Sequence, residues 1–102
     1  MRLVALAFVS ALALSTAAFA ADHAVTIKGM KFSPATLSIK AGDTITFTNE
    51  DSAPHTATAK DGAFDTGRLN KGQSKTVTVS AAGDHPYICS IHPSMKGTVS
   101  VK

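Results

Sequence analysis

Apolar and polar residues alternate one by one in several segments of the chain after residue 24. The clearest alternating segments are 25–28, 37–40, 44–48, 76–80 and 98–102. An alternation of period two is typical of β-strands that bury one face, and no stretch of useful length has helical spacing instead. These segments are also rich in Thr, Val and Ile, which favour strands. The sequence therefore predicts an all-β protein.

Turn signals divide this pattern into short and regularly spaced strands. Gly-Asp pairs at 42–43 and 83–84 mark two of the turns. The longest connection is expected over 60–73, where Phe64 and Leu69 should anchor it to the core. Such a series of strands suggests a β-sandwich or barrel. Seven strands are expected, at 24–29, 36–40, 43–49, 55–59, 74–80, 85–90 and 96–102.

The first twenty residues are expected to be a secretory signal peptide. All but four of them are apolar, one Arg precedes the run Leu3–Leu14, and Ala18-Phe19-Ala20 has the small-x-small form of a cleavage site. The apolar run is too short for a membrane anchor, and no stop-transfer charges follow it. We therefore expect export to the periplasm with loss of residues 1–20. The mature chain, residues 21–102, should be one domain without a membrane span.

Charge and size exclude some classes of function. The chain has 10 basic and 7 acidic residues, a net charge of +3, and the signal peptide contains one of the basic residues, Arg2. The remaining basic residues form no cluster, so nucleic-acid binding is not expected. A mature chain of 82 residues (102 − 20) leaves little room for a deep substrate cleft. The protein is therefore not expected to be an enzyme.

A group of potential metal ligands lies near the end of the sequence. Cys89 is the single cysteine, so it forms no internal disulfide, and a free thiol in an oxidising compartment needs an occupant. His92 and Met95 follow at intervals of three residues, and His55 lies upstream. One thiolate, two imidazoles and a thioether are the donors of a blue-copper site, because the sulfurs stabilise Cu(I) and the imidazoles also suit Cu(II). The pattern predicts one copper ion held by His55, Cys89, His92 and Met95.

Other interpretations of these residues fit less well. Structural zinc sites use more Cys or His and no Met. A catalytic Cys–His pair would leave Met95 without a role, and no Gly-x-Ser-x-Gly motif supports a hydrolase. Cys89 alone could be a small buried hydrophobic residue, but the three ligand types together favour copper. The two remaining histidines, His23 and His85, are expected to lie in solvent.

The mature chain resembles the cupredoxins over nearly its full length. The resemblance is carried by Phe32-Ser33-Pro34, by residues 41–49, by Pro54-His55, by residues 64–67 and by Tyr87-Ile88-Cys89 with the ligand loop that follows. Within the family, the two-residue gaps in this ligand loop are similar to those of amicyanins, whereas plastocyanins place Met further from His. The resemblance implies a Greek-key β-sandwich or barrel of about seven to eight strands with one type 1 copper.

The resemblance also implies individual roles. His55, Cys89 and His92 would be the strong equatorial ligands, and Met95 the weak axial ligand. Asn49 would support them by tying the loop that contains His55 to the loop that contains Cys89.

Two functions remain open at this point. The first is a soluble one-electron carrier in which copper cycles between Cu(II) and Cu(I), with His92 at an exposed apolar patch. The resemblance implies redox partners such as a c-type cytochrome or a periplasmic dehydrogenase, and a monomer is expected. The second is copper storage, delivery or tolerance without redox turnover. The ligand set favours the first, because delivery benefits from exposed and exchangeable ligands.

Overall fold

The structure, a computed structural model, describes residues 19–102, which form eight strands and no helix. The strands are β1 (Asp22–Lys28), β2 (Lys31–Ser33), β3 (Thr36–Ile39), β4 (Asp43–Asn49), β5 (Thr58–Ala59), β6 (Ser74–Val79), β7 (Gly83–Ile88) and β8 (Lys96–Val101). Within this range no helix is long and apolar enough to cross a membrane. The predicted signal peptide falls almost wholly outside the described residues.

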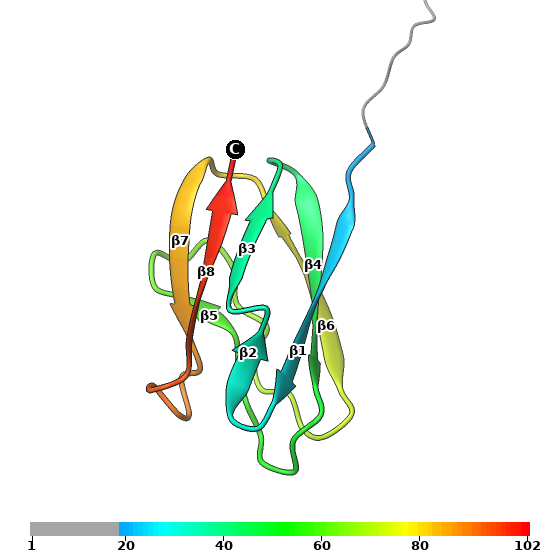
Figure 1. Ribbon diagram of the computed structural model, residues 1–102, viewed down its shortest axis with the longest axis vertical. Coiled ribbons are helices and arrows are strands. Elements are labelled where there is room, and N and C mark those ends of the chain that lie inside the picture. The colour runs from blue at the N-terminus through cyan, green and yellow to red at the C-terminus, as the bar shows by residue number, and fades with distance from the viewer. Residues whose placement is uncertain (1–18) are drawn as a thin grey trace, which may run out of the picture.

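Two four-stranded sheets stack face to face (Figure 1). The first has the strand order β2-β1-β4-β6 and the second has the order β3-β8-β7-β5. β1 pairs parallel with β4, and β3 pairs parallel with β8, while the other neighbours are antiparallel. Successive strands such as β4 and β5, or β6 and β7, belong to different sheets, so the chain crosses repeatedly between layers, as in Greek-key sandwiches. The predicted all-β sandwich is confirmed.

Aromatic rings from both layers meet at the centre of the core. The ring centroids of Phe47 and Phe64 are 5.8 Å apart, and each lies 5.6 Å from that of Tyr87. Phe64 belongs to the connection 60–73, which is therefore anchored to the core as predicted. The ring of Tyr87 also covers Gly97 on the neighbouring strand β8, in the space that a side chain would take there. The core thus depends on one residue having no side chain.

Two parts of the strand prediction are wrong. The strand expected at 55–59 shortens to β5, because its first residues bond elsewhere: His55 pairs with Leu69, and the N–H of Thr56 donates to the sulfur of Cys89. β2 is absent from the prediction, because its three residues contain one buried side chain, Phe32, and show too little alternation to be recognised.

His85 is buried, so the prediction that it lies in solvent is wrong. Its Nδ1 lies 2.6 Å from a carboxylate oxygen of Asp61, and its Nε2 lies 2.6 Å from the backbone oxygen of Ala81. Both partners only accept hydrogen bonds, so they favour the form of the ring with a proton on each nitrogen, which is a cation. The carbonyl of Ala81, and then the carboxylate of Asp61, raises the pKa of His85 above its usual value. A buried charge therefore joins the turn after β5 to the turn after β6.

We expect the substitution His85→Gln to destabilise the protein most at low pH. Because the pKa of His85 is raised on folding, its stabilising contribution is complete below the unfolded value of about 6.5 and is lost as the pH rises through the folded value. Urea unfolding midpoints of both proteins at about pH 5.5 and about pH 8.5 measure this difference. A difference that does not change with pH would contradict a protonated His85.

Candidate metal centre

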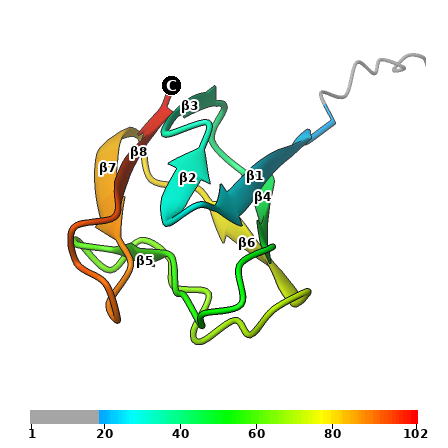
Figure 2. The same cartoon turned by 60° about the horizontal axis from the view of Figure 1, so that its bottom comes forward.

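Three predicted ligands meet at one end of the sandwich. His55 lies in the connection between β4 and β5, Cys89 directly follows β7, and His92 lies in the turn before β8. β4 and β7 end at the same end of the molecule, which is the lower end in Figure 1 and is turned toward the viewer in Figure 2. The loops that follow these two strands are therefore brought together although they are far apart in the sequence.

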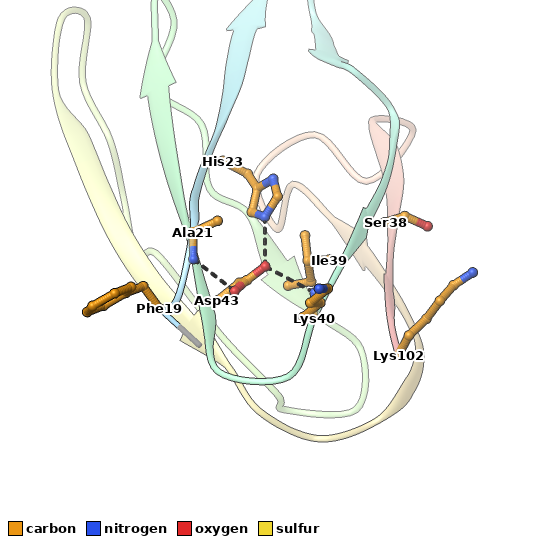
Figure 3. Close-up of a pocket in the computed structure, with 8 residues that line it drawn as sticks. All are labelled: Phe19, Ala21, His23, Ser38, Ile39, Lys40, Asp43 and Lys102. Carbon is orange, nitrogen blue, oxygen red and sulfur yellow. Dashed lines mark hydrogen bonds and ion pairs between the residues drawn. The ribbon is translucent and has the colours of Figure 1, made fainter. Parts of the chain in front are cut away.

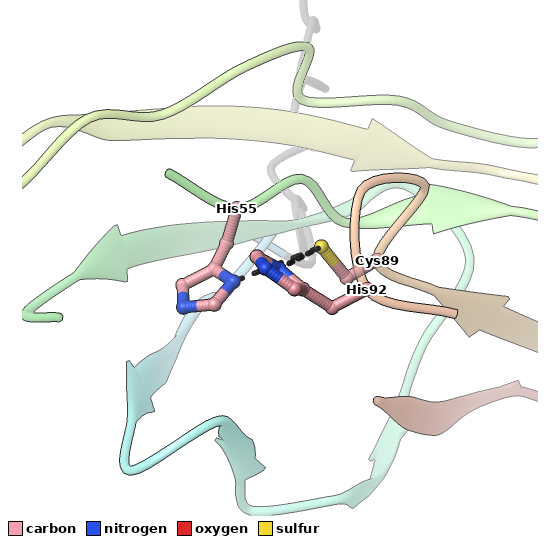
Figure 4. Close-up of side chains that lie close together, drawn as sticks. All are labelled: His55, Cys89 and His92. Atoms are coloured by element: carbon pink, nitrogen blue, oxygen red, sulfur yellow. Dashed lines mark hydrogen bonds between the residues drawn. The ribbon is translucent and has the colours of Figure 1, made fainter. Parts of the chain in front are cut away.

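The donor atoms of these three side chains face one another (Figure 4). The Sγ of Cys89 lies 3.7 Å from Nδ1 of His55 and 3.8 Å from Nδ1 of His92. Donor atoms of all three lie within 4.8 Å of one another, and the two imidazole rings meet edge-on with centroids 5.0 Å apart. His55 and Cys89 are fully buried, whereas His92 is partly exposed. Two donors are thus shielded from water, and the third lies at the surface.

This arrangement fits a single metal ion. A metal about 2.0 Å from nitrogen and about 2.3 Å from sulfur holds those donors about 3.7 Å apart when the angle at the metal is 120°. The separations of 3.7 and 3.8 Å therefore suit a trigonal arrangement. A thiolate with two imidazoles is a donor set for copper and does not suit the hard cations Mg²⁺ and Ca²⁺, which prefer oxygen.

Asp51 orients the His55 ring. Its carboxylate lies 2.9 Å from Nε2 of His55, and because a carboxylate only accepts, Nε2 carries the proton. Nδ1, which faces Cys89, therefore keeps its lone pair for a metal. The backbone N–H groups of Met30 and Gly29 donate to the same carboxylate and, together with His55, lower the pKa of Asp51. The β1–β2 turn thereby keeps Asp51 ionised beside His55.

Comparisons with known proteins show the family. A family model described as a cupredoxin-like domain matches residues 2–101. The chain belongs to the cupredoxin-like family. It is similar to amicyanin-alpha of Methylorubrum extorquens, with 37% identity over 96% of this chain and 98% of that relative. It is also similar to amicyanin of Paracoccus denitrificans, with 34% identity over 84% and 71%, and to chloroplastic plastocyanin of Tetradesmus obliquus, with 36% identity over 70% and 58%.

Solved structures of cupredoxins have the same fold. An amicyanin variant in its Cu(I) form matches with a TM-score of 0.73 and 33% identity, covering 85% of this chain and 86% of that chain. An amicyanin variant in its oxidised state matches with a TM-score of 0.72 and 32% identity, covering 78% and 81%. The resemblance to the cupredoxins, and to amicyanins among them, is confirmed.

The ligand loop of this cupredoxin is closed by its own backbone. The N–H of Met95 donates to the carbonyl of His92 at 2.9 Å, and the carbonyl of Met95 accepts from the N–H of Cys89 at 3.1 Å. The Met95 side chain is buried, although it follows three exposed or partly exposed residues. A loop held in this way keeps three potential ligands in fixed positions, which suits a metal that changes oxidation state with little rearrangement.

Thr56 connects the two ligand loops of this cupredoxin. Its backbone N–H donates to the Sγ of Cys89 at 3.3 Å, and its hydroxyl oxygen accepts from the N–H of Ser90 at 2.8 Å. These two bonds fix the position of the Cys89 sulfur relative to the His55 loop. Thr56 is not among the residues predicted for the site.

Asn49 is fully buried, and its side chain forms hydrogen bonds with the His55 loop and its neighbour Leu69 but not with the Cys89 loop. Its amide nitrogen donates to the carbonyl oxygens of Ala53 and Leu69 at 2.9 and 2.8 Å. Its amide oxygen accepts from the N–H of Asp51 at 2.9 Å. Leu69 in turn pairs with His55, so Asn49 holds both sides of the loop that presents this ring. The connection to the Cys89 loop, which the resemblance assigns to Asn49, is made by Thr56.

Proposed function

We propose that this protein is a type 1 copper protein that carries single electrons between redox partners, with copper cycling between Cu(II) and Cu(I). The observation that carries the proposal is the meeting of two imidazoles and one cysteine sulfur at 3.7–3.8 Å, with a buried Met in the same closed loop. His55, Cys89 and His92 would hold the copper strongly and Met95 weakly. Copper supplies the one-electron couple, and the chain supplies a fixed and shielded set of donors.

Burial of the donors supports a carrier over an enzyme or a delivery protein. His55 and Cys89 have no exposed surface, so neither a substrate nor a copper acceptor can contact them. His92 is the ligand that reaches the surface, where Ile91 (39% exposed) and Pro93 lie beside it. A small apolar area around one exposed ligand suits a brief encounter with another redox protein. A c-type cytochrome or a periplasmic dehydrogenase would be a partner of this kind, met by a monomer.

The domain arrangement belongs to the same proposal. Residues 1–20 would direct export to the periplasm and be removed, and residues 21–102 would form the copper protein. All eight strands lie within Asp22–Val101, so the described fold requires nothing from the segment that would be lost.

A visible spectrum of the copper-loaded mature chain tests this function. We expect an intense blue band from thiolate-to-copper charge transfer, reversible bleaching with ascorbate, and rapid electron exchange with a small redox protein. Colourless copper binding, or a blue form that cannot be reduced and reoxidised, would favour storage or delivery instead.

Replacing Met95 with Gln should lower the reduction potential while copper stays bound. The amide oxygen of Gln favours Cu(II) over Cu(I) relative to a thioether, and the axial ligand tunes the potential of such sites. Voltammetry of the two proteins at one pH measures the shift, and Ser94→Ala, an exposed change next to Met95, is the matched control. An unchanged or raised potential in Met95→Gln would contradict an axial role for Met95.

A further inference from the structure

A second cluster of polar groups lies where β4 begins, at the opposite end of the sandwich from the candidate metal centre. Figure 3 shows the side chains of this cluster. Asp43 begins β4 and is 5% exposed, and its carboxylate accepts three hydrogen bonds. The donors are the backbone N–H of Ala21 at 2.9 Å, the backbone N–H of Lys40 at 3.0 Å and Nε2 of His23 at 2.9 Å. His23, then Ala21 and Lys40, lower the pKa of Asp43 to about 2. The group is therefore a carboxylate at every ordinary pH.

This buried anion has no full-time cation in the described part of the chain. Within residues 19–102, the ion-pair partner of Asp43 is His23, which is charged only when protonated, and no Lys or Arg lies within 4.0 Å of the carboxylate. A buried charge that only dipoles balance is costly unless a cation accompanies it. The atom placed best to become that cation is the nitrogen of Ala21, the first residue after the predicted cleavage site.

We infer that cleavage between Ala20 and Ala21 turns the Ala21 nitrogen into an ammonium group that forms an ion pair with Asp43, so that processing completes the fold at this end. This inference rests on the proposed removal of residues 1–20. Hydrolysis adds water across the peptide bond: the oxygen goes to the Ala20 carbonyl carbon, which leaves as a carboxylate, and the nitrogen of Ala21 ends as an ammonium at neutral pH. A signal peptidase is the class of enzyme that catalyses this step.

The position of the cut decides whether the pair forms. A chain that begins one residue earlier presents an uncharged amide N–H to Asp43, and one that begins at Asp22 presents no nitrogen at that place. The carbonyl of Ala21 also accepts the N–H of Thr44 at 3.0 Å, which holds Ala21 at the start of the β1–β4 pairing. The ammonium would therefore be held on a strand and not on a free tail.

The other charged groups near the pair are few. His23, Lys40 and Lys102 line the same pocket as Asp43, together with Phe19, which leaves with the signal peptide. Asp22 points to other partners, because its carboxylate accepts from the hydroxyls of Thr44 and Thr46. The α-amino group of Ala21 would thus be the cation that contacts Asp43 directly. Because the other charged groups nearby are few, removing this ion pair should cause a measurable loss of stability.

The test compares two chains that differ by one residue. One begins at Ala21 and the other at Ala20, and thermal unfolding of each is followed at about pH 7 and at about pH 10 in copper-loaded and copper-free forms. Pairing raises the pKa of the α-amino group above its unfolded value of about 7.7–8.0, so the added stability is complete below that value and is lost as the pH rises through the folded one. We expect the Ala21 chain to melt several degrees higher at the lower pH, with the gap closing at the higher pH.

Asp43→Asn in both chains completes a cycle and should abolish the gap at the lower pH. Equal melting temperatures of the two Asp43 chains, or a gap that survives in Asp43→Asn or at the higher pH, would overturn the inference. The mass of the exported protein gives a separate check: a start at Ala21 supports the inference, and any other start overturns it. The copper-free series keeps this test apart from the proposed copper chemistry, because a failure to bind copper leaves it unchanged.

Discussion

The substitution Cys89→Ser is expected to remove the blue colour completely. The intense band of a type 1 site arises from charge transfer between thiolate and copper, and the hydroxyl of Ser cannot supply it. Ser also loses the soft donor that stabilises Cu(I), so the variant should bind copper weakly and lose reversible redox activity. The Sγ of Cys89 is fully buried between the two histidines, and no second thiol in the chain can replace it. Copper content and the visible spectrum measure both effects.

Ser90→Ala is the matched control for this experiment. Ser90 is exposed and adjacent to Cys89. The change removes the contact of its hydroxyl with the Thr56 hydroxyl at 3.0 Å, but its backbone N–H still donates to Thr56. The control should keep the intense band and the copper content of the parent protein. Retention of the band in Cys89→Ser, or its loss in Ser90→Ala, would argue against copper coordination by the Cys89 sulfur.

The substitution Gly97→Ala should destabilise the fold strongly without touching any ligand. A Cβ at this position would lie under 3.0 Å from two ring carbons and the hydroxyl oxygen of Tyr87. That ring cannot turn aside, because it is 1% exposed and packs against Phe32, Phe47 and Phe64. Forcing extra volume into a packed core costs about 1–3 kcal/mol and sometimes more. We expect a loss near the upper end, measured as a lower denaturant midpoint of the copper-free protein.

Two further variants separate the steric clash from other effects. Ser100→Ala, a partly exposed position on the same strand, should leave the unfolding midpoint nearly unchanged. Tyr87→Ala is destabilising alone because it leaves a cavity, but adding Gly97→Ala to it should cost little more. Additive losses in the double variant would show that the clash with the ring is not the cause.

Much of the fold follows from local alternation of apolar and polar residues. In β4 every second side chain is buried from Asp43 to Asn49, and its predicted bounds agree with the structure. The strand predictions fail where contacts with distant parts of the chain determine the backbone conformation instead of the local alternation of residues. Residues 55–57 look like strand, yet Thr56 donates its N–H to a sulfur from a distant loop.

In the candidate site, too, some residues can be recognised from the sequence and others cannot. Cys89, His92 and Met95 are recognisable because their spacing and residue types carry the chemistry. Thr56 acts through a backbone N–H, which every residue except Pro possesses, so no residue type reveals it. Asp51 could have been found from the sequence only by its position. An acidic residue four positions before a predicted ligand His can orient the ring of that His, as Asp51 does here.

The burial of His85 could not be predicted from the neighbouring residues in the sequence either. Its two partners, Asp61 and Ala81, come from turns that precede it by 24 and 4 residues, and they meet it only when the sheets stack. Polarity alone places a histidine at the surface, whereas a matched pair of acceptors places this one in the interior.

The edges of the two sheets bear on how the protein behaves at high concentration. An open edge offers unpaired N–H and C=O groups to other chains, and proteins limit this risk with short or charged edge strands. Here β2, β3 and β5 are edges of three, four and two residues, too short to template another strand. β6 is the longer edge, and it carries an exposed Lys75 opposite Phe47 of its partner strand. The resistance of this protein to edge-to-edge aggregation should therefore depend on β6, and an apolar residue at position 75 would remove the charge that protects this edge.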